Sequence, residues 1–173
     1  MGLAGRYLLR CPARMEFVWS PWRYDYIASA GKTPASCVFC IGEDRSQDAD
    51  RLILYRGNEN FVILNLFPYT AGHFMVAPFA HTARFDEAPS GQLTEMMELA
   101  QRGMRALKRL YQPEGFNVGM NLGHCAGAGI REHFHLHVVP RWIGDANFMG
   151  ITAETRVLPE ALSVTYGRMS EVF

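Results

Sequence analysis

Long apolar runs and an excess of either charge are both missing from this sequence, and each absence excludes a class of protein. No apolar run approaches the roughly 20 residues that a membrane-spanning helix needs, so we expect no membrane span. The 17 Lys and Arg residues balance the 17 Asp and Glu residues. A protein that grips nucleic acid usually carries a concentrated basic face, so we expect no stable nucleic-acid partner.

Cysteine is scarce as well, with four residues in 173. Residues 1–14 hold only the short apolar run Tyr7–Leu9 between arginines, which is too little for a secretory signal, so the expected location is cytoplasmic. There the thiols are expected to be reduced or to bind metal instead of forming disulfides. We interpret residues 1–14 as an N-terminal extension, with Met1 and Met15 as alternative starts, and residues 15–173 as a single domain.

The pattern of apolar and turn residues predicts an α+β fold with an antiparallel sheet of about five strands. Turn-punctuated segments predict strands at residues 51–56, 61–65, 73–78, 116–122 and 133–142. One long helix is expected over residues 90–111, with Ser90 as its N-cap and Pro113 beyond its end. Its expected buried stripe is Leu93, Met96, Met97, Ala100, Met104, Leu107 and Tyr111. A short C-terminal helix is expected from Pro159 to about Met169.

The segment 133–142 has histidine at every second position at its start. On a strand, alternate side chains share one face, so His133, His135 and His137 would line one face while the apolar residues between them pack on the other. Imidazoles are costly to bury without partners. We therefore interpret the row as a functional site, against the alternatives of an ordinary polar edge strand or a metal-binding tract.

A glycine-rich loop, Gly123–Gly129, directly precedes the histidines. Glycine allows backbone N–H groups to converge on an anion, although a loop that merely turns is the alternative. Beside a bound phosphate, one imidazole can attack phosphorus while a neighbour controls its tautomer. The middle histidine, His135, is the natural nucleophile because it is flanked on both sides.

The motif His-x-His-x-His followed by two apolar residues resembles the histidine triad (HIT) superfamily of nucleotide hydrolases and transferases. Further segments resemble a bacterial branch that includes diadenosine tetraphosphate phosphorylases, and the likeness covers roughly residues 15–166. These segments include Trp19–Arg23, Cys37–Cys40, Phe116–Asn121, Gly144–Met149 and Thr155–Glu160. The resemblance implies a HIT-like fold and a homodimer, to which the aromatic N-terminal arm and the C-terminal tail would contribute.

The resemblance also implies residue roles. His135 would take the nucleotidyl group, His137 would contact the phosphate oxygens and the scissile bridge, and His73 would hold the other imidazoles in the right tautomer. Nucleotide-binding roles fall on Asn65 at the ribose, Asn121 at the phosphate, and on Gly127, Gly129 and His137.

The pair Cys37 and Cys40 by itself leaves redox activity, structural zinc and chance open. The resemblance implies a structural zinc ion held by Cys37, Cys40, His81 and His133, which would tie the N-terminal arm to the histidine strand. The alternative is that His133 belongs to a catalytic hydrogen-bonded row.

The implied function is cleavage of a dinucleoside polyphosphate, such as diadenosine tetraphosphate, at an α-phosphate through a nucleotidyl-histidine, with phosphate or water as acceptor. AMP itself is a further expected ligand. An adenosine phosphoramidate hydrolase and a non-catalytic nucleotide sensor are the alternatives. Gly129 and Ile130 stand where other branches place glutamine and a hydroxyl residue, so leaving-group assistance must come from backbone N–H groups, Asn121 or Arg131. Histidine at position 137 argues against the uridylyltransferase branch.

Overall fold

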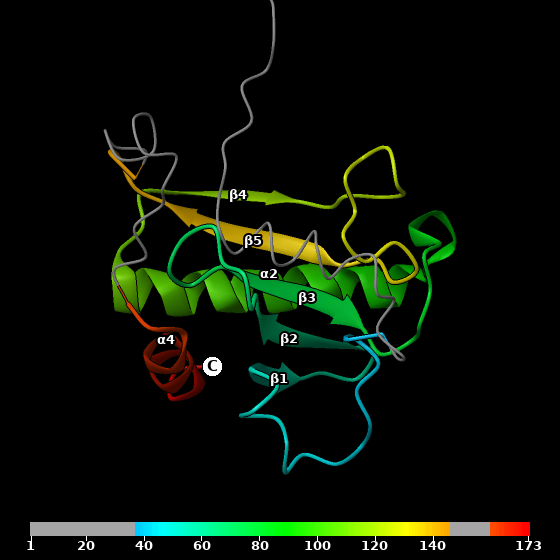
Figure 1. Cartoon of the computed structure of the whole chain (residues 1–173), viewed down its shortest axis with the longest axis horizontal. Helices are drawn as coiled ribbons and strands as arrows, with labels where there is room; N and C mark the ends of the chain where they lie inside the picture. The colour runs from blue at the N-terminus through cyan, green and yellow to red at the C-terminus, as the bar shows by residue number, and fades with distance from the viewer. Residues whose placement is uncertain (1–36, 146–159) are drawn as a thin grey trace, which may run out of the picture.

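A computed structural model of the chain describes residues 37–145 and 160–173. Five antiparallel strands form one sheet in the order β1-β2-β3-β5-β4 (Figure 1). Their bounds are β1 Ile53–Arg56, β2 Asn60–Leu64, β3 Phe74–Pro78, β4 Gly115–Gly119 and β5 Leu136–Arg141. The predicted extension at residues 1–14, the aromatic arm at 19–27 and the segments 146–149 and 155–159 lie outside the described residues.

The helices confirm the α+β prediction. The helix α2, Ser90–Tyr111, lies along one face of the sheet and is preceded by a 3-10 turn, η1, Phe85–Glu87 (Figure 1). The C-terminal helix α4, Leu162–Ser170, packs against α2 and β1. The predicted bounds of α2 are confirmed, and α4 starts three residues later than expected.

Two details of α2 were wrong in the sequence analysis. Pro89 occupies the N-cap, and within the described residues no side chain caps the helix, so Ser90 is not the cap. Ser90 and Gly91, the first two residues of the helix, are exposed, so water can satisfy their N–H groups in place of a side-chain cap. Met97, placed on the buried stripe by periodicity, is 49% exposed.

The sheet has an apolar layer on each face. The layer under α2 is built from sheet residues Val62, Leu64, Phe74, Val76, Leu136 and Val138, from Phe134 just before β5, and from helix residues Met96, Leu99, Ala100 and Leu107. The second layer, on the opposite face, comprises Phe39, Ile53, Phe61, Ile63, Met75 and Ala77. This second layer lies on the face that carries the histidines.

Two glycines let α2 approach the sheet closely. A Cβ at Gly103 would lie 2.4 Å from the ring of Phe74, so no larger residue fits between helix and sheet there. Gly72 has φ +81°, and a Cβ on it would lie 2.5 Å from Leu107 Cδ2. Gly72 directly precedes His73, so both its backbone conformation and its contact with α2 determine where His73 enters the site.

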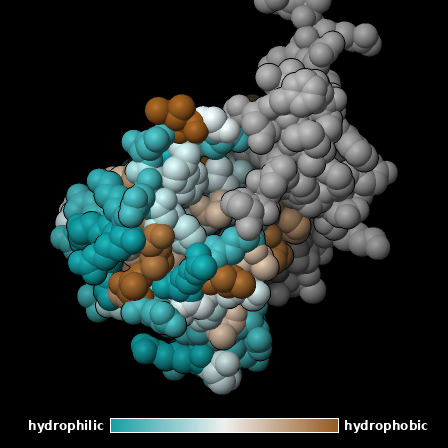
Figure 2. All heavy atoms as spheres, turned by 90° about the vertical axis from the view of Figure 1, so that its left-hand side faces the viewer, coloured by the Kyte–Doolittle hydropathy of each residue, from teal (hydrophilic) through white to brown (hydrophobic). Residues whose placement is uncertain are grey.

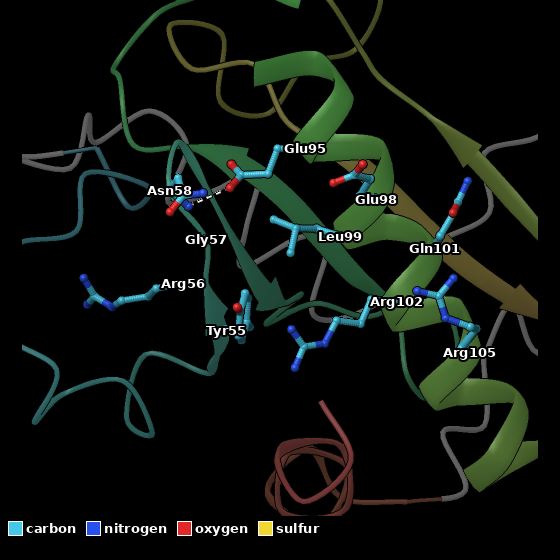
Figure 3. Close-up of a pocket in the computed structure, with 10 residues that line it drawn as sticks. All are labelled: Tyr55, Arg56, Gly57, Asn58, Glu95, Glu98, Leu99, Gln101, Arg102 and Arg105. Atoms are coloured by element: carbon cyan, nitrogen blue, oxygen red, sulfur yellow. Dashed lines mark hydrogen bonds between the residues drawn. The ribbon is translucent and has the colours of Figure 1, made fainter. Parts of the chain in front are cut away.

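A carboxylate on α2 holds the β1–β2 turn. Glu95 accepts hydrogen bonds from the backbone N–H groups of Asn58, Glu59 and Asn60. Figure 3 shows Glu95 reaching from α2 toward Asn58, at one side of a hollow of about 420 Å³. Although burial acts to raise it, these hydrogen bonds lower the pKa of Glu95 overall. A Cβ at Gly57 would lie 2.7 Å from the Glu95 carboxylate, so the turn needs glycine there.

The C-terminal residues close the other end of β1. The Tyr166 hydroxyl donates to the carbonyl of Ile53, at 3.2 Å. The guanidinium of Arg102 lies 4.1 Å from the ring of Tyr55 and 5.1 Å from that of Phe173, so one cation joins α2 to both. The end of the molecule that carries α4 is mainly hydrophilic, with small separate hydrophobic patches (Figure 2). Across residues 37–145 and 160–173, no helix has the length and apolarity to cross a membrane.

Candidate functional site

The three triad histidines lie on one side of the chain, as predicted, but only His137 belongs to a strand. β5 begins at Leu136, so the expected strand over 133–142 is shorter at both ends. The rings of His133 and His135 both contact Phe39, with centroids 5.3 Å and 4.7 Å away, and His135 lies 4.8 Å from His137. The intervening apolar side chains, Phe134, Leu136 and Val138, are buried under α2.

The tautomer of His135 is fixed by the backbone carbonyl two residues before it. Its Nδ1 lies 2.9 Å from the carbonyl oxygen of His133. A carbonyl can only accept, so Nδ1 carries the proton and Nε2 keeps its lone pair. Burial lowers the pKa of His135, against the opposing effect of the His133 carbonyl, which favours the neutral ring. No residue in the described ranges hydrogen-bonds Nε2. The result is an imidazole with the lone pair that a nucleophile needs.

A second chain of hydrogen bonds fixes His137. The backbone N–H of Tyr69 donates to Nδ1 of His73, at 3.2 Å, so the proton of neutral His73 is on Nε2. That Nε2 lies 3.0 Å from Nδ1 of His137 and donates to it. Neutral His137 therefore carries its proton on Nε2 and can donate it to a substrate oxygen. Burial, followed by repulsion from His135, lowers the pKa of His137 to about 4.

Tyr69 is a site residue that the sequence analysis missed. Its ring centroid lies 4.8 Å from that of His73 and 6.5 Å from that of His137, close to parallel with the latter. The one available signal was its place in the short turn Pro68–Gly72 immediately before His73. Tyr69 thus contributes both a main-chain donor and an aromatic surface to the pair.

Asn65 lies beside the same pair, directly after β2. Its Oδ1 accepts the N–H of Phe67 at 2.9 Å, and its Nδ2 lies 3.3 Å from Nδ1 of His73. The predicted ribose-binding side chain therefore already takes part in ordering the turn that leads to His73. Its Nδ2 group has two protons, so one remains for a further acceptor.

The glycine-rich loop uses some of its amides internally. Gly123 and Gly127 have φ near +80°, a conformation that favours glycine. The N–H groups of Gly127 and Ala128 donate to carbonyls within the loop. In the part of the chain that the structure describes, nothing accepts the N–H of Gly129 or of the next residue, and these two amides can serve an anion.

The side chains after the loop differ in character. Ile130 packs against the apolar layer on the histidine face, so it adds nothing polar to the site. Asn121, which follows β4, and Arg131 are both exposed. Both side chains are therefore open to solvent and to a ligand at this end of the site.

Four predicted metal ligands come together beside the histidine row. One ligand atom from each of Cys37, Cys40, His81 and His133 lies within 4.8 Å of all the others. The Sγ of Cys37 lies 3.6 Å from Nδ1 of His133, and the Sγ of Cys40 lies 3.3 Å from Nδ1 of His81. Tetrahedral metal–sulfur and metal–nitrogen bonds of about 2.3 Å and 2.0 Å give similar separations.

The surroundings of these ligands also fit a cation. Nε2 of His133 donates to the carbonyl of Pro78 at 2.8 Å, which leaves Nδ1 as the free lone pair and matches the outer contacts typical of metal-bound imidazoles. Burial, then repulsion and a hydrogen bond from Cys37, raises the pKa of Cys40. Two adjacent thiolates are therefore unfavourable unless a cation lies between them. The cluster is compatible with a metal site.

Comparisons with known proteins agree with this geometry. Residues 46–142 match the HIT domain. The chain is 36% identical over 160 residues to an AP-4-A phosphorylase of Mycobacterium tuberculosis, covering 88% of this chain and 81% of that protein.

Solved structures have the same fold. A zinc-bound histidine triad family protein from Mycobacterium smegmatis has 26% identity and a TM-score of 0.57, over 86% of this chain and 90% of that one. A hypothetical histidine triad nucleotide-binding protein from Sulfolobus tokodaii has 23% identity and a TM-score of 0.60, over 79% and 91% of the two chains. The second likeness bears on the fold alone.

The relay through Tyr69, His73 and His137 predicts one tautomer for His137. Long-range proton–nitrogen NMR correlations at pH 7 should show Nε2 protonated and Nδ1 bare. Because burial lowers the pKa of His137 to about 4, the ring should stay neutral as the pH falls through 6.5, where an unfolded histidine takes up its proton. His73→Ala should remove the donor and mix the two tautomers. A His137 protonated on Nδ1 at pH 7 would contradict the relay, and one that titrates near 6.5 would contradict the effect of burial.

Proposed function

Because the chain belongs to the HIT domain family, we propose that it is an enzyme that cleaves dinucleoside polyphosphates by nucleotidyl transfer through His135. The observation that carries the proposal is the pairing of opposite tautomers in adjacent rings. His135 presents a bare Nε2, while His137, with its centroid 4.8 Å away, presents a protonated one. The likeness to an AP-4-A phosphorylase supports diadenosine tetraphosphate as substrate.

The reaction runs in two displacements. His135 Nε2 attacks the α-phosphorus, a phosphorus–nitrogen bond forms, and the bond to the bridging oxygen breaks to release ATP from diadenosine tetraphosphate. His137 Nε2–H and the amides of Gly129 and Ile130 donate to phosphate oxygens as charge develops on them. Phosphate or water then attacks the adenylyl group, and the phosphorus–nitrogen bond breaks to return the lone pair to His135. The products are ADP with phosphate as acceptor and AMP with water.

Other residues bind and orient the substrate. His73 keeps the proton of His137 on Nε2, Asn65 offers its remaining amide proton to the ribose, and Asn121 reaches the phosphate. Ile130 supplies no hydroxyl to the leaving group, which disfavours simple phosphoramidate hydrolysis. The amides of Gly129 and Ile130 donate from the main chain, so they need no particular side chain.

The test is the product pattern with and without phosphate. Diadenosine tetraphosphate should give ATP and ADP when phosphate is present, or ATP and AMP when only water can accept. His135→Ala should lower turnover by about 10⁴-fold or more, because the nucleophile itself is lost, and its thermal unfolding midpoint should stay near that of the wild type. Mass spectrometry should find an adenylyl adduct on the wild type and none on the variant. Nucleotide binding without products or adduct would favour a sensor.

We also propose that the metal cluster holds structural zinc. The donor set of two thiols and two imidazoles is one that zinc favours, and Phe134 N–H, bonded to the carbonyl of Thr82, keeps the His81 segment beside the histidine row. The likeness to a zinc-bound histidine triad protein supports the same assignment. Bound zinc would join the Cys37–Cys40 turn to the segment before β5. Reduced thiols at these positions suit a cytoplasmic location.

Zinc content tests this assignment directly. The wild type should carry one zinc ion per chain, and His133→Ala should lose most of it, because one of four ligands and its outer contact are removed. A chelator should lower the unfolding midpoint of the wild type and leave that of His133→Ala unchanged. Cys125→Ser, at an exposed thiol outside the cluster, is the control and should bind zinc normally. Unchanged zinc in His133→Ala would refute the assignment.

Finally, we propose a homodimer that pairs through β4. This strand ends the sheet, and Asn117, Val118 and Gly119 are exposed on it. An unpaired strand edge with an apolar side chain is a surface that another strand can join. Val118 is 44% exposed, and sedimentation analysis should find a dimer that Val118→Glu converts to monomer by placing a charge at the edge. A wild-type monomer at micromolar concentration would contradict the proposal.

A further inference from the structure

The apolar residue between the two cysteines lies against the nucleophile. Phe39 is 2% exposed, and its ring centroid lies 4.7 Å from that of His135 at an interplanar angle of 43°. The same ring is 5.3 Å from His133, edge-on, and 6.4 Å from Phe61 of β2. Phe39 is thus wedged between the sheet and the two imidazoles.

The turn that carries Phe39 is short and closed at both ends. Cys40 N–H donates to the carbonyl of Cys37, and Ile41 N–H donates to that of Phe39. Both cysteines belong to the metal-compatible cluster, so Phe39 is within two residues of a ligand on either side. The backbone of Phe39 has little freedom once that cluster is assembled. The position of its ring relative to His135 is therefore fixed.

His135 needs such a constraint. One hydrogen bond, from Nδ1 to the His133 carbonyl, fixes which nitrogen is protonated. It leaves the ring able to swing, because the terminal torsion of a histidine is broad and roughly two-fold. A swing of the ring moves Nε2 away from the line of attack on phosphorus, and in-line displacement is sensitive to such misplacement. The ring contacts with Phe39 and His137 restrict this motion from two directions.

We propose that Phe39 is a positioning residue that holds the His135 ring for attack, and that the Cys37–Cys40 turn acts on the reaction through it. The metal-compatible cluster is then connected to the nucleophile twice, by the Phe39 ring and by the carbonyl of its ligand His133. The inference rests on the nucleotidyl transfer proposed above for its kinetic part, whereas its structural part concerns the His135 ring alone.

Variants of two neighbours in the turn test the proposal. Phe39→Ala should lower the rate of adenylyl-His135 formation by about 10- to 100-fold, because the attacking atom is misplaced. KM should stay within about threefold of the wild type, because Phe39 is 2% exposed and offers little surface to a ligand. Phe39→Leu, which keeps most of the apolar contact, should lose less. Val38→Ala is the matched control: Val38 lies in the same turn but is 52% exposed, so the rate should not change.

NMR supplies a readout that does not depend on activity. In the wild type and in Val38→Ala, the His135 ring should show one tautomer, with a slowly exchanging Nδ1 proton. Phe39→Ala and Phe39→Leu should broaden that signal or mix the tautomers while the zinc content stays at the wild-type level. An inactive wild type with these ring signals would refute the proposed reaction but leave the positioning role supported.

Other results would overturn the proposal. If Phe39→Ala and Phe39→Leu keep both the wild-type rate and the single His135 tautomer, Phe39 does not position the ring. If the rate falls only in step with lost zinc in both variants, Phe39 serves the stability of the turn and not the nucleophile.

Discussion

The site depends on one local hydrogen bond, which Nδ1 of His135 donates to the carbonyl of His133. It is local in sequence and needs no partner from elsewhere in the fold, yet it decides which nitrogen of the middle ring can form a bond to phosphorus. A second chain of hydrogen bonds fixes the other tautomer in His137. The backbone N–H of Tyr69 donates to His73, and His73 donates to Nδ1 of His137. Two rings of one chemical kind thereby carry their protons on different nitrogens, so His135 keeps a lone pair on Nε2 while His137 can donate from its Nε2.

Burial keeps the histidine rings neutral and so preserves these tautomers. His133, His135 and His137 are all held in surroundings that lower their pKa values, chiefly by desolvation. A charged ring would lose the lone pair on which nucleophilic attack or metal binding depends. The apolar layer on this face of the sheet, Phe39 and Met75 among its members, therefore contributes to chemistry as well as to packing.

Much of this arrangement was predictable from periodicity. The alternation of histidines with Phe134, Leu136 and Val138 correctly assigned the two faces, and the period of residues 90–111 gave the bounds of α2. The resemblance to histidine triad proteins brought Cys37, Cys40, His81 and His133 together, and the structure places their ligand atoms within 4.8 Å of one another. These signals are strong because they repeat, or because they combine several residue types that one function explains.

The remaining features depend on contacts that no local pattern encodes. His133 and His135 precede β5 because the pairing with β3 stops at Leu136. Before that point Phe134 N–H donates to the carbonyl of Thr82, and the His133 side chain donates to that of Pro78. Met97 is 49% exposed, whereas Gly103 of the same helix faces the ring of Phe74 so closely that no Cβ fits, and helical period alone does not say which of the two faces the sheet. Phe39 and Tyr69 look like ordinary apolar residues in sequence, and their proximity to imidazoles appears only in three dimensions.

Gly72 gives α2 an influence on chemistry that takes place on the other side of the sheet. A Cβ on Gly72 would lie 2.5 Å from Leu107 Cδ2 on the helix, and the next residue, His73, hydrogen-bonds His137. Substitutions that repack α2 can therefore affect the position of His73. A bulkier side chain at position 107 would press on the turn that leads into His73, so a substitution in α2 chosen for thermostability can also move the His73–His137 pair.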